Sequence, residues 1–273
     1  MAEEHAESEE QGCRERLGPT KLVVVKVGSS SLSDEQGHID RERMTKLCDG
    51  VMGLRRRGID VLLVSSGAIR SGRAVMSDSA DGEISHLQAL AAIGQVLLME
   101  AYKGILAAKG CKVAQILLTW DDFKDERRLI NLMNTFKTLL SLGVVPIVNE
   151  NDTTAVDEIR FGDNDTLSAL VAVHMRADLL ILLSDVDGLY DGDPKDAGSK
   201  LISFVERVTA DIERLATDEY GGSGGMGSKL KAARMVTEAG LPVVIANASR
   251  EDVVTDAIDG KRVGTIFRPR ERV

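Results

Sequence analysis

Residues 144–171 read VVPIVNENDTTAVDEIRFGDNDTLSALV, and this segment gives the clearest indication of the fold. Its first five residues are β-branched apart from Pro146, which indicates a short buried strand. Residues 166–173 are mostly apolar and follow Asp163, Asn164 and Asp165, residue types that favour a helix N-terminus. One polar cluster therefore follows a strand and another precedes a helix, which are places where open α/β sheets carry ligand sites.

An alternative interpretation is that NEND and GDND are ordinary Asx-rich turns with helix-capping residues. However, the two clusters lie within ~15 residues of each other in a chain whose strands and helices alternate. They gather several acidic side chains between two apolar segments: Glu150, Asp152, Asp157, Glu158, Asp163 and Asp165. This concentration favours a site over two unrelated turns.

Composition bounds the fold class. The 273 residues suffice for one large α/β domain or two small ones, and a hydrophobic content of 43% can build a sizeable core. Aromatic residues make up only 3%, which favours buried parallel strands of Val, Leu and Ile over an aromatic-rich β-sandwich. The formal net charge of −9 argues against nucleic acid as a main partner.

Cysteine and histidine patterns predict neither a disulfide framework nor a metal site. Cys13, Cys48 and Cys111 are scattered and lack CxxC spacing, and the four histidines are equally dispersed. We find no apolar run of ~18 residues and no signal-peptide segment. We therefore expect a cytoplasmic protein in a reducing compartment, without a membrane partner.

Strands and helices alternate along the chain, which predicts a mostly parallel sheet with helices on both faces. Residues 1–18 are rich in Glu, and we expect them to form a disordered tail before one domain at 19–273. A soft division falls near residue 176, between the acidic clusters and a later glycine-rich loop. The expected strands are 21–27, 61–64, 113–118, 144–148, 179–183, 243–246 and an edge strand at 263–267. The expected helices are 39–57, 84–108, 123–142, one starting near 166, and 229–239.

Lys26 is the first candidate for chemistry outside the opening stretch. It lies near the carboxyl end of an apolar strand and is followed by Gly28 and three serines. The backbone amides of such a turn can meet phosphate oxygens. The alternative is a lysine whose stem is buried while its charge reaches solvent.

The glycine-rich segment at 221–229, GGSGGMGSK, is the second candidate. It formally matches GxGxxG, but no strand precedes it, so a Rossmann fingerprint is rejected. It is not a Walker A loop either, because Ser228 precedes Lys229 instead of following it. What remains is a glycine cradle with a lysine at a helix start, or else a flexible linker.

The strand-end loop SDVDGLYDGDPK, residues 184–195, is the third candidate. It fails as a calcium loop, because Leu189 and Tyr190 stand where a ligand and a glycine are required. With Tyr190 and Lys195, it could instead hold a nucleotide base and ribose. No Ser-His-Asp or Cys-His arrangement stands out. Lysines, glycine amides and carboxylates together are typical of phosphoryl transfer.

Taken together, these motifs resemble the amino acid kinase family, and NEND followed by GDND is typical of its glutamate 5-kinase branch. The resemblance covers about residues 21–267 and implies a three-layer αβα sandwich. It rests on KVGSSSL at Lys26, SSGAI at 65–69, VNEND at 148–152, FGDNDTLSA at 161–169, SDVDGLY at 184–190 and GGMGSK at 224–229.

The resemblance also implies roles for individual residues. Lys26 and Lys229 would contact the ATP phosphates and the transferring phosphoryl group, and Asp165 would organise both lysines. The glutamate-binding residues would be Ser66, Gly67, Asp152, Asp163 and Asn164. The ATP-binding residues would be Lys26, Gly28, Ser184, Asp185, Tyr190, Lys195, Ser223, Gly224, Gly225, Met226, Gly227, Ser228 and Lys229.

By the same resemblance, the expected reaction is ATP-dependent phosphorylation of the L-glutamate side chain, the first step of proline synthesis. The first half would hold glutamate and the second ATP, with Mg²⁺ entering on the nucleotide. Proline would inhibit near residues 152–163, and the chain would form a homodimer or homotetramer without the C-terminal PUA domain of many bacterial members. The alternatives are acetylglutamate or uridylate kinase activity, or a nucleotide-sensing protein without turnover.

Overall fold

The computed structural model describes residues 2–17, 19–77, 83–155, 164–216 and 225–271. At its centre lies a sheet with the strand order β3-β4-β2-β1-β5-β9-β10-β8. The neighbouring pairs in this described sheet are parallel, except that β9 and β10 run antiparallel. The strand bounds are β1 Leu22–Val27, β2 Asp60–Ser65, β3 Val113–Leu118, β4 Val145–Glu150, β5 Leu179–Ser184, β8 Phe204–Val205, β9 Val243–Asn247 and β10 Thr265–Phe267.

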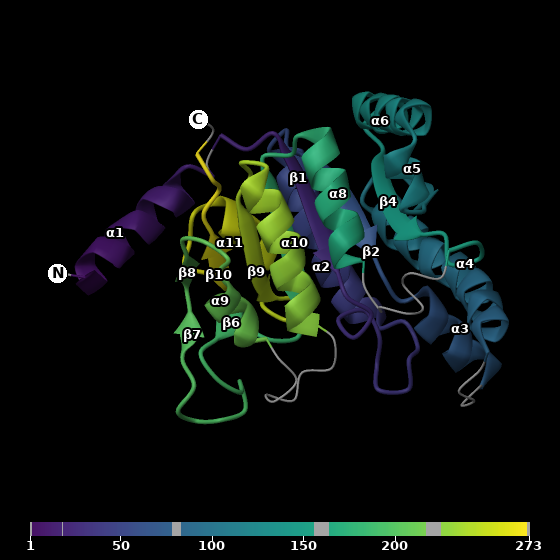
Figure 1. Cartoon of the computed structure of the whole chain (residues 1–273). Coiled ribbons are helices and arrows are strands. Elements are labelled where there is room, and N and C mark those ends of the chain that lie inside the picture. Colours follow the sequence, from purple (N-terminus) through teal and green to yellow (C-terminus); the bar gives the residue numbers. More distant parts are fainter. Residues whose placement is uncertain (1, 18, 78–82, 156–163, 217–224, 272–273) are drawn as a thin grey trace.

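Helices cover both faces of the sheet, so the predicted three-layer αβα sandwich is confirmed (Figure 1). The two faces follow from the two-residue period of the strands: in β1, Val23 and Val25 join one core cluster and Val24 joins the other. The first face carries α2 (Arg41–Arg56), α4 (Ile84–Ala108) and α11 (Val253–Ile258). The second face carries α6 (Glu126–Ser141), α8 (Asp165–Met175) and α10 (Gly225–Glu238).

Several short elements complete the described chain. They are α3 (Ala68–Met76), α5 (Asp121–Lys124), α9 (Ala210–Arg214) and a hairpin of β6 (Leu189–Tyr190) and β7 (Leu201–Ile202). Helices α3 and α4 approach backbone to backbone at two glycines. A Cβ on Gly94 would lie 1.8 Å from the carbonyl oxygen of Ala68, and one on Gly72 would lie 2.0 Å from that of Leu90. Larger residues at either glycine would force the helices apart.

Helix α4 corrects the expectation that no long apolar run exists. It contains an 18-residue window of mean hydropathy 1.4, so its length and composition would suit a membrane span. However, 44% of that window is buried inside the molecule. Leu98, Tyr102 and Leu106 belong to the core cluster on the first face of the sheet. Packing within the domain thus accounts for one side of α4, whereas Ile93 and Val96 on the same helix are exposed.

The N-terminal segment is the largest correction, because it is a helix, α1 (Ala2–Glu15), and not a disordered tail. Arg14 is fully buried and pairs with Glu10 one turn earlier. Its guanidinium also donates to the carbonyl oxygens of Ser203, Lys261, Val263 and Gly264. Composition could not reveal this docking, because the acceptors lie 189 to 250 positions away in the sequence.

Other boundaries differ from the predictions in smaller ways. The expected helix at 123–142 divides into α5 and α6, because Asp125 is extended and its side chain caps α6. Strand β10 is not an edge strand, because it lies between β9 and β8. Helix α10 begins at Gly225, so part of the expected glycine loop is already helical. Helix 84–108 and strand 113–118 are confirmed at their predicted bounds.

Candidate active site

Two lysines and one aspartate form a buried charged group at the carboxyl end of β1. Lys26 Nζ forms an ion pair with Asp165 Oδ1, and Lys229 Nζ lies 3.2 Å from Asp165 Oδ2. All three side chains are buried. Asp165 therefore lies between the two lysines. The group carries two positive charges and one negative charge within a low-dielectric environment, where charges must be paired.

The local structure around this group explains how it is held. Asp165 is the first residue of α8, and Lys229 belongs to the first turns of α10. Lys229 Nζ donates to the carbonyl oxygen of Gly225 at 3.1 Å, and Ser228 Oγ donates to Asp165 Oδ2 at 2.8 Å. Two helix N-termini thus converge on the lysines. Their amide dipoles add to a positive potential that suits an anion.

A second polar cluster adjoins the first through Asn164, which precedes Asp165 in the chain. Asn164 Nδ2 lies 3.0 Å from Ser66 Oγ, 2.7 Å from Asn149 Oδ1 and 3.3 Å from the carbonyl oxygen of Ser65. Asn164 Oδ1 is buried and has no hydrogen-bond partner among the described residues. Gly67 follows Ser66 at φ 112°, a left-handed conformation that a residue with a side chain rarely adopts.

Asp152 lies beyond the end of β4 and is buried at 4% relative exposure. Within the described part of the chain, its Oδ1 atom has no hydrogen-bond partner. Burial raises the pKa of this carboxyl from 3.8 to about 6, because the charged form loses hydration. A cation bound beside Asp152 would reverse this effect. Asp163 and most of the segment 153–162 lie outside the described residues, as do Ser223 and Gly224.

A cleft of about 560 Å³ lies between the loop after β5, the β6–β7 hairpin and the start of α10. Predicted ATP-binding residues that line this cleft are Ser184, Asp185, Tyr190, Lys195, Gly225 and Met226. The other predicted ATP-binding residues among those described do not line it: Lys26, Gly28, Gly227, Ser228 and Lys229. Gly225 joins the cleft to the charged group, because its carbonyl oxygen accepts from Lys229. A ligand in the cleft can therefore extend towards the two lysines.

Comparison with known proteins identifies the family. The model of the amino acid kinase family matches residues 21–247, which include both lysines, both polar clusters and the cleft. The chain belongs to the amino acid kinase family.

Several curated relatives are glutamate 5-kinases. The one from Clostridium tetani is 46% identical over 260 residues, covering 93% of this chain and 97% of that protein. The one from Dictyoglomus thermophilum is 47% identical over 255 residues, covering 92% of this chain and 68% of that protein. The one from Trichlorobacter lovleyi is 44% identical over 257 residues, covering 93% and 68%.

Two solved structures share the fold of this chain at low sequence identity. UMP kinase from Bacillus anthracis superposes with a TM-score of 0.65 at 18% identity, covering 93% of this chain and 98% of that one. Carbamate kinase from Giardia lamblia, bound to AMP-PNP, superposes with a TM-score of 0.64 at 18% identity, covering 93% and 100%. At this identity the likeness shows the fold alone.

Two polar residues near the site were not assigned by the sequence analysis. Asn149 contacts Asn164, and its place in NEND was the signal that could have assigned it. Asn247, at the end of β9, lines the cleft and donates to Asp187 Oδ1 at 2.9 Å. Asn247 lies beside β5 only because β9 pairs with β5 in the sheet, so no local sequence pattern could have predicted its place at the cleft.

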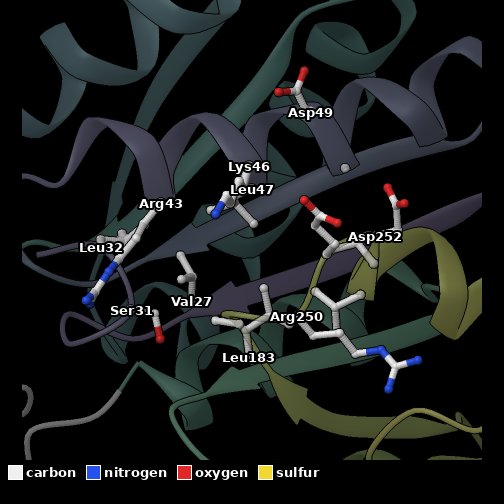
Figure 2. A pocket seen from close by; sticks show the side chains of 15 residues that line it. Val27, Ser31, Leu32, Arg43, Lys46, Leu47, Asp49, Leu183, Arg250 and Asp252 are labelled. Carbon is white, nitrogen blue, oxygen red and sulfur yellow. The ribbon is translucent and has the colours of Figure 1, made fainter.

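A second hollow, of about 270 Å³, opens on the α2 face of the sheet (Figure 2). None of the predicted site residues lines it. The positively charged side chains that line it form ion pairs within the protein: Arg43 pairs with Asp40, Lys46 with Glu42, and Arg250 with Asp256. In Figure 2 the first two cations come from α2 and the third from the segment before α11. These pairings make the hollow a poor candidate for an anion site.

Metal binding by the protein alone finds no support among the described residues. They contain no group of three or more His, Cys, Asp or Glu side chains that could hold a metal ion. The carboxylate of Asp165 is occupied by two lysines and a serine hydroxyl. The described side chains therefore do not fit a site that holds Mg²⁺ without a nucleotide, since Mg²⁺ requires several oxygen ligands.

Proposed function

We propose that this protein transfers the γ-phosphoryl group of ATP to the side-chain carboxylate of L-glutamate, which is the first step of proline biosynthesis. One observation carries the proposal. The Lys26–Asp165–Lys229 group adjoins the cleft through Gly225 and adjoins the second polar cluster through Asn164, the residue before Asp165. A phosphoryl donor in the cleft and an acceptor at the polar cluster would meet at the lysines. The glutamate 5-kinases at 44–47% identity support the same assignment.

The acceptor side suits the ammonium group of an amino acid. Asp152 Oδ1 and Asn164 Oδ1 are buried oxygens without partners among the described residues. Oxygens of this kind cost free energy unless they accept hydrogen bonds, and a substrate ammonium group supplies such donors with a positive charge. The roles assigned above to Ser66, Gly67 and Asp163 are part of this proposal. The side-chain carboxylate of glutamate would then point towards Lys26.

The chemistry requires charge stabilisation and no general base. A glutamate side chain has a reference pKa of ~4.3, so it is an ionised nucleophile at neutral pH. The barrier arises from bringing this anion onto a polyanionic phosphate. Lys26 and Lys229 would stabilise the negative charge of the transferring group, assisted by the N-termini of α8 and α10. Asp165 would keep the like-charged lysines at a fixed separation.

The donor side is assigned to ATP. The cleft contains a tyrosine, a lysine and the start of α10, which suit a nucleotide and its phosphates. The roles of Gly28, Gly227 and Ser228, and those of Ser223 and Gly224 outside the described residues, belong to the same proposal. Mg²⁺ would enter on the phosphates of the nucleotide and supply positive charge there.

Three further features are proposed with this function: inhibition by proline at the glutamate site, assembly into a homo-oligomer, and location in the cytoplasm. Competition between proline and glutamate in steady-state assays tests the first. Absence of inhibition at millimolar proline would exclude it. Analytical ultracentrifugation tests the second, and a monomer at the assay concentration would exclude it. Fractionation of the native cells tests the third, and a membrane-bound protein would exclude it.

The test of the main proposal is trapping of the product with hydroxylamine, which converts acyl phosphates to hydroxamates. The purified protein is assayed with ATP, Mg²⁺ and a panel of glutamate, acetylglutamate and aspartate. UMP is tested in parallel by measuring ADP formation, because its phosphorylation gives no acyl phosphate. We expect glutamate to be used far better than the other acceptors. Efficient phosphorylation of acetylglutamate or UMP would refute the assignment in favour of another family activity. ATP binding without turnover on any acceptor would indicate a nucleotide sensor.

A further inference from the structure

Four amide side chains form a continuous hydrogen-bonded chain that ends at the second polar cluster. Gln95 on α4 donates from Nε2 to Oε1 of Gln115 on β3 at 3.1 Å. Asn149 on β4 donates from Nδ2 to Gln95 Oε1 at 2.9 Å. Asn164 donates from Nδ2 to Asn149 Oδ1 at 2.7 Å. The chain thus connects the edge of the sheet to the start of α8.

Backbone groups fix the direction of this chain. The backbone N–H of Glu150 donates to Asn149 Oδ1 at 2.9 Å, and the carbonyl oxygen of Ser65 accepts from Asn164 Nδ2 at 3.3 Å. A backbone N–H can only donate and a carbonyl can only accept, so each asparagine amide has one orientation that satisfies its neighbours. Asn149 must then direct its Nδ2 atom at an acceptor. Gln95 Oε1 is that acceptor.

The fixed orientation determines what Asn164 offers to a ligand. Its Nδ2 atom is used within the protein, so its Oδ1 atom is the one left for an external donor. We propose that Gln95 is a positioning residue that, together with the backbone groups of Ser65 and Glu150, holds the Asn149–Asn164 pair in the orientation that presents Asn164 Oδ1 to the substrate ammonium group. This inference rests on the proposed function and extends it to the recognition of the amino group.

Loss of Gln95 Oε1 would act through Asn149. Asn149 is 1% exposed, so an unpaired Nδ2 atom there would be buried without compensation. Rotation of its amide towards another acceptor would break the bond to Asn164 Nδ2. Asn164 could then turn a donor towards the ammonium group instead of an acceptor. The amide N–H of Asn164 and the ammonium group of the substrate would then repel each other, because both are hydrogen-bond donors. The preference of the enzyme for substrates that carry an amino group would therefore fall.

The experiment compares glutamate with glutarate, which has the same chain and both carboxylates but no ammonium group. kcat/KM for both acceptors is measured by hydroxylamine trapping on the unaltered protein and on Gln95→Leu, Gln95→Glu and Gln115→Leu. For Gln95→Leu we expect a loss of roughly 10- to 100-fold with glutamate, mostly in KM, and a much smaller loss with glutarate. The KM for ATP should stay unchanged.

The other variants separate positioning from general damage. In Gln95→Glu a protonated carboxyl has the same pattern of one acceptor and one donor as the amide, so preference for glutamate should be retained. Gln115 is exposed, and water can replace its side chain, so Gln115→Leu should resemble the unaltered protein. If Gln95→Leu does not fold, the inference is tested with Gln95→Glu. A Gln95→Glu protein that no longer prefers glutamate over glutarate overturns the inference.

Two outcomes distinguish failure of this inference from failure of the proposed function. Equal losses with glutamate and glutarate in Gln95→Leu would show that Gln95 acts on the whole site and would overturn the inference alone. No glutamyl phosphate from the unaltered protein would overturn the proposed function and the inference with it. A glutamate-specific loss that Gln95→Glu restores supports both.

Discussion

Replacing Asp165 by Asn tests whether the two lysines depend on one carboxylate. The substitution keeps the size of the side chain and removes the charge that pairs with Lys26 and Lys229. Both lysines are buried, so their charges would be left without a partner in a low-dielectric site. Breaking a buried pair in this way costs about 3–5 kcal/mol of folding free energy. Part of that cost is relieved if one lysine loses its proton.

Turnover should fall together with stability. A deprotonated or displaced lysine no longer stabilises the transferring phosphoryl group, and loss of one such interaction lowers kcat by roughly 10²- to 10³-fold. The KM for glutamate should change little, because Asp165 makes no proposed contact with glutamate. Steady-state kinetics at saturating substrates and urea denaturation measure the two effects. Asp211→Asn removes an exposed carboxylate paired with Arg214 and should change neither quantity by much.

A double variant decides whether the three residues act as one unit. If Asp165 works by holding the lysines, Asp165→Asn combined with Lys229→Ala should be little slower than the slower single variant. Rate losses that multiply would refute the view that Asp165 acts through Lys229. A folded Asp165→Asn protein with more than about half of the original kcat would refute the charge argument altogether.

Three further predictions concern other parts of the molecule. Because burial raises the pKa of Asp152 to about 6, kcat/KM for glutamate should increase as the pH rises through that value, and Asp152→Asn should abolish this dependence. The sign for stability is the opposite: the free protein should lose stability as the pH rises from about 4 through about 6, since ionisation is harder in the folded state. Arg14→Leu should lower the free energy of unfolding by about 3 kcal/mol in urea denaturation, whereas the exposed Arg16→Leu should not; equal effects would contradict the role of α1 docking. In Gly188→Ala a Cβ would lie 2.5 Å from a β10 side chain, so the hairpin should shift and the KM for ATP should rise roughly 10-fold, while Gly198→Ala, with open space around it, should behave normally.

The sequence alone predicted the central strands and the main helices, and it indicated a site for phosphate chemistry. Two-residue and 3.6-residue periods predicted the central strands and the main helices, because apolar spacing records which face of an element is buried. Polar residues after strands and before helices predicted where a ligand site would form. The types of residue at Lys26, Asp165 and Lys229 predicted phosphate chemistry before any geometry was known.

Which of these residues come into contact depends on the tertiary structure. Lys229 and Asp165 are 64 positions apart, and their contact depends on the N-termini of α8 and α10 converging on the end of β1. The order of the strands follows from non-local packing, which local periodicity does not record. The same reason explains the docking of Arg14 on the far end of the chain and the direction of the amide chain through Gln95. In both cases a buried polar side chain is stabilised by hydrogen-bond partners from segments that are remote in the sequence.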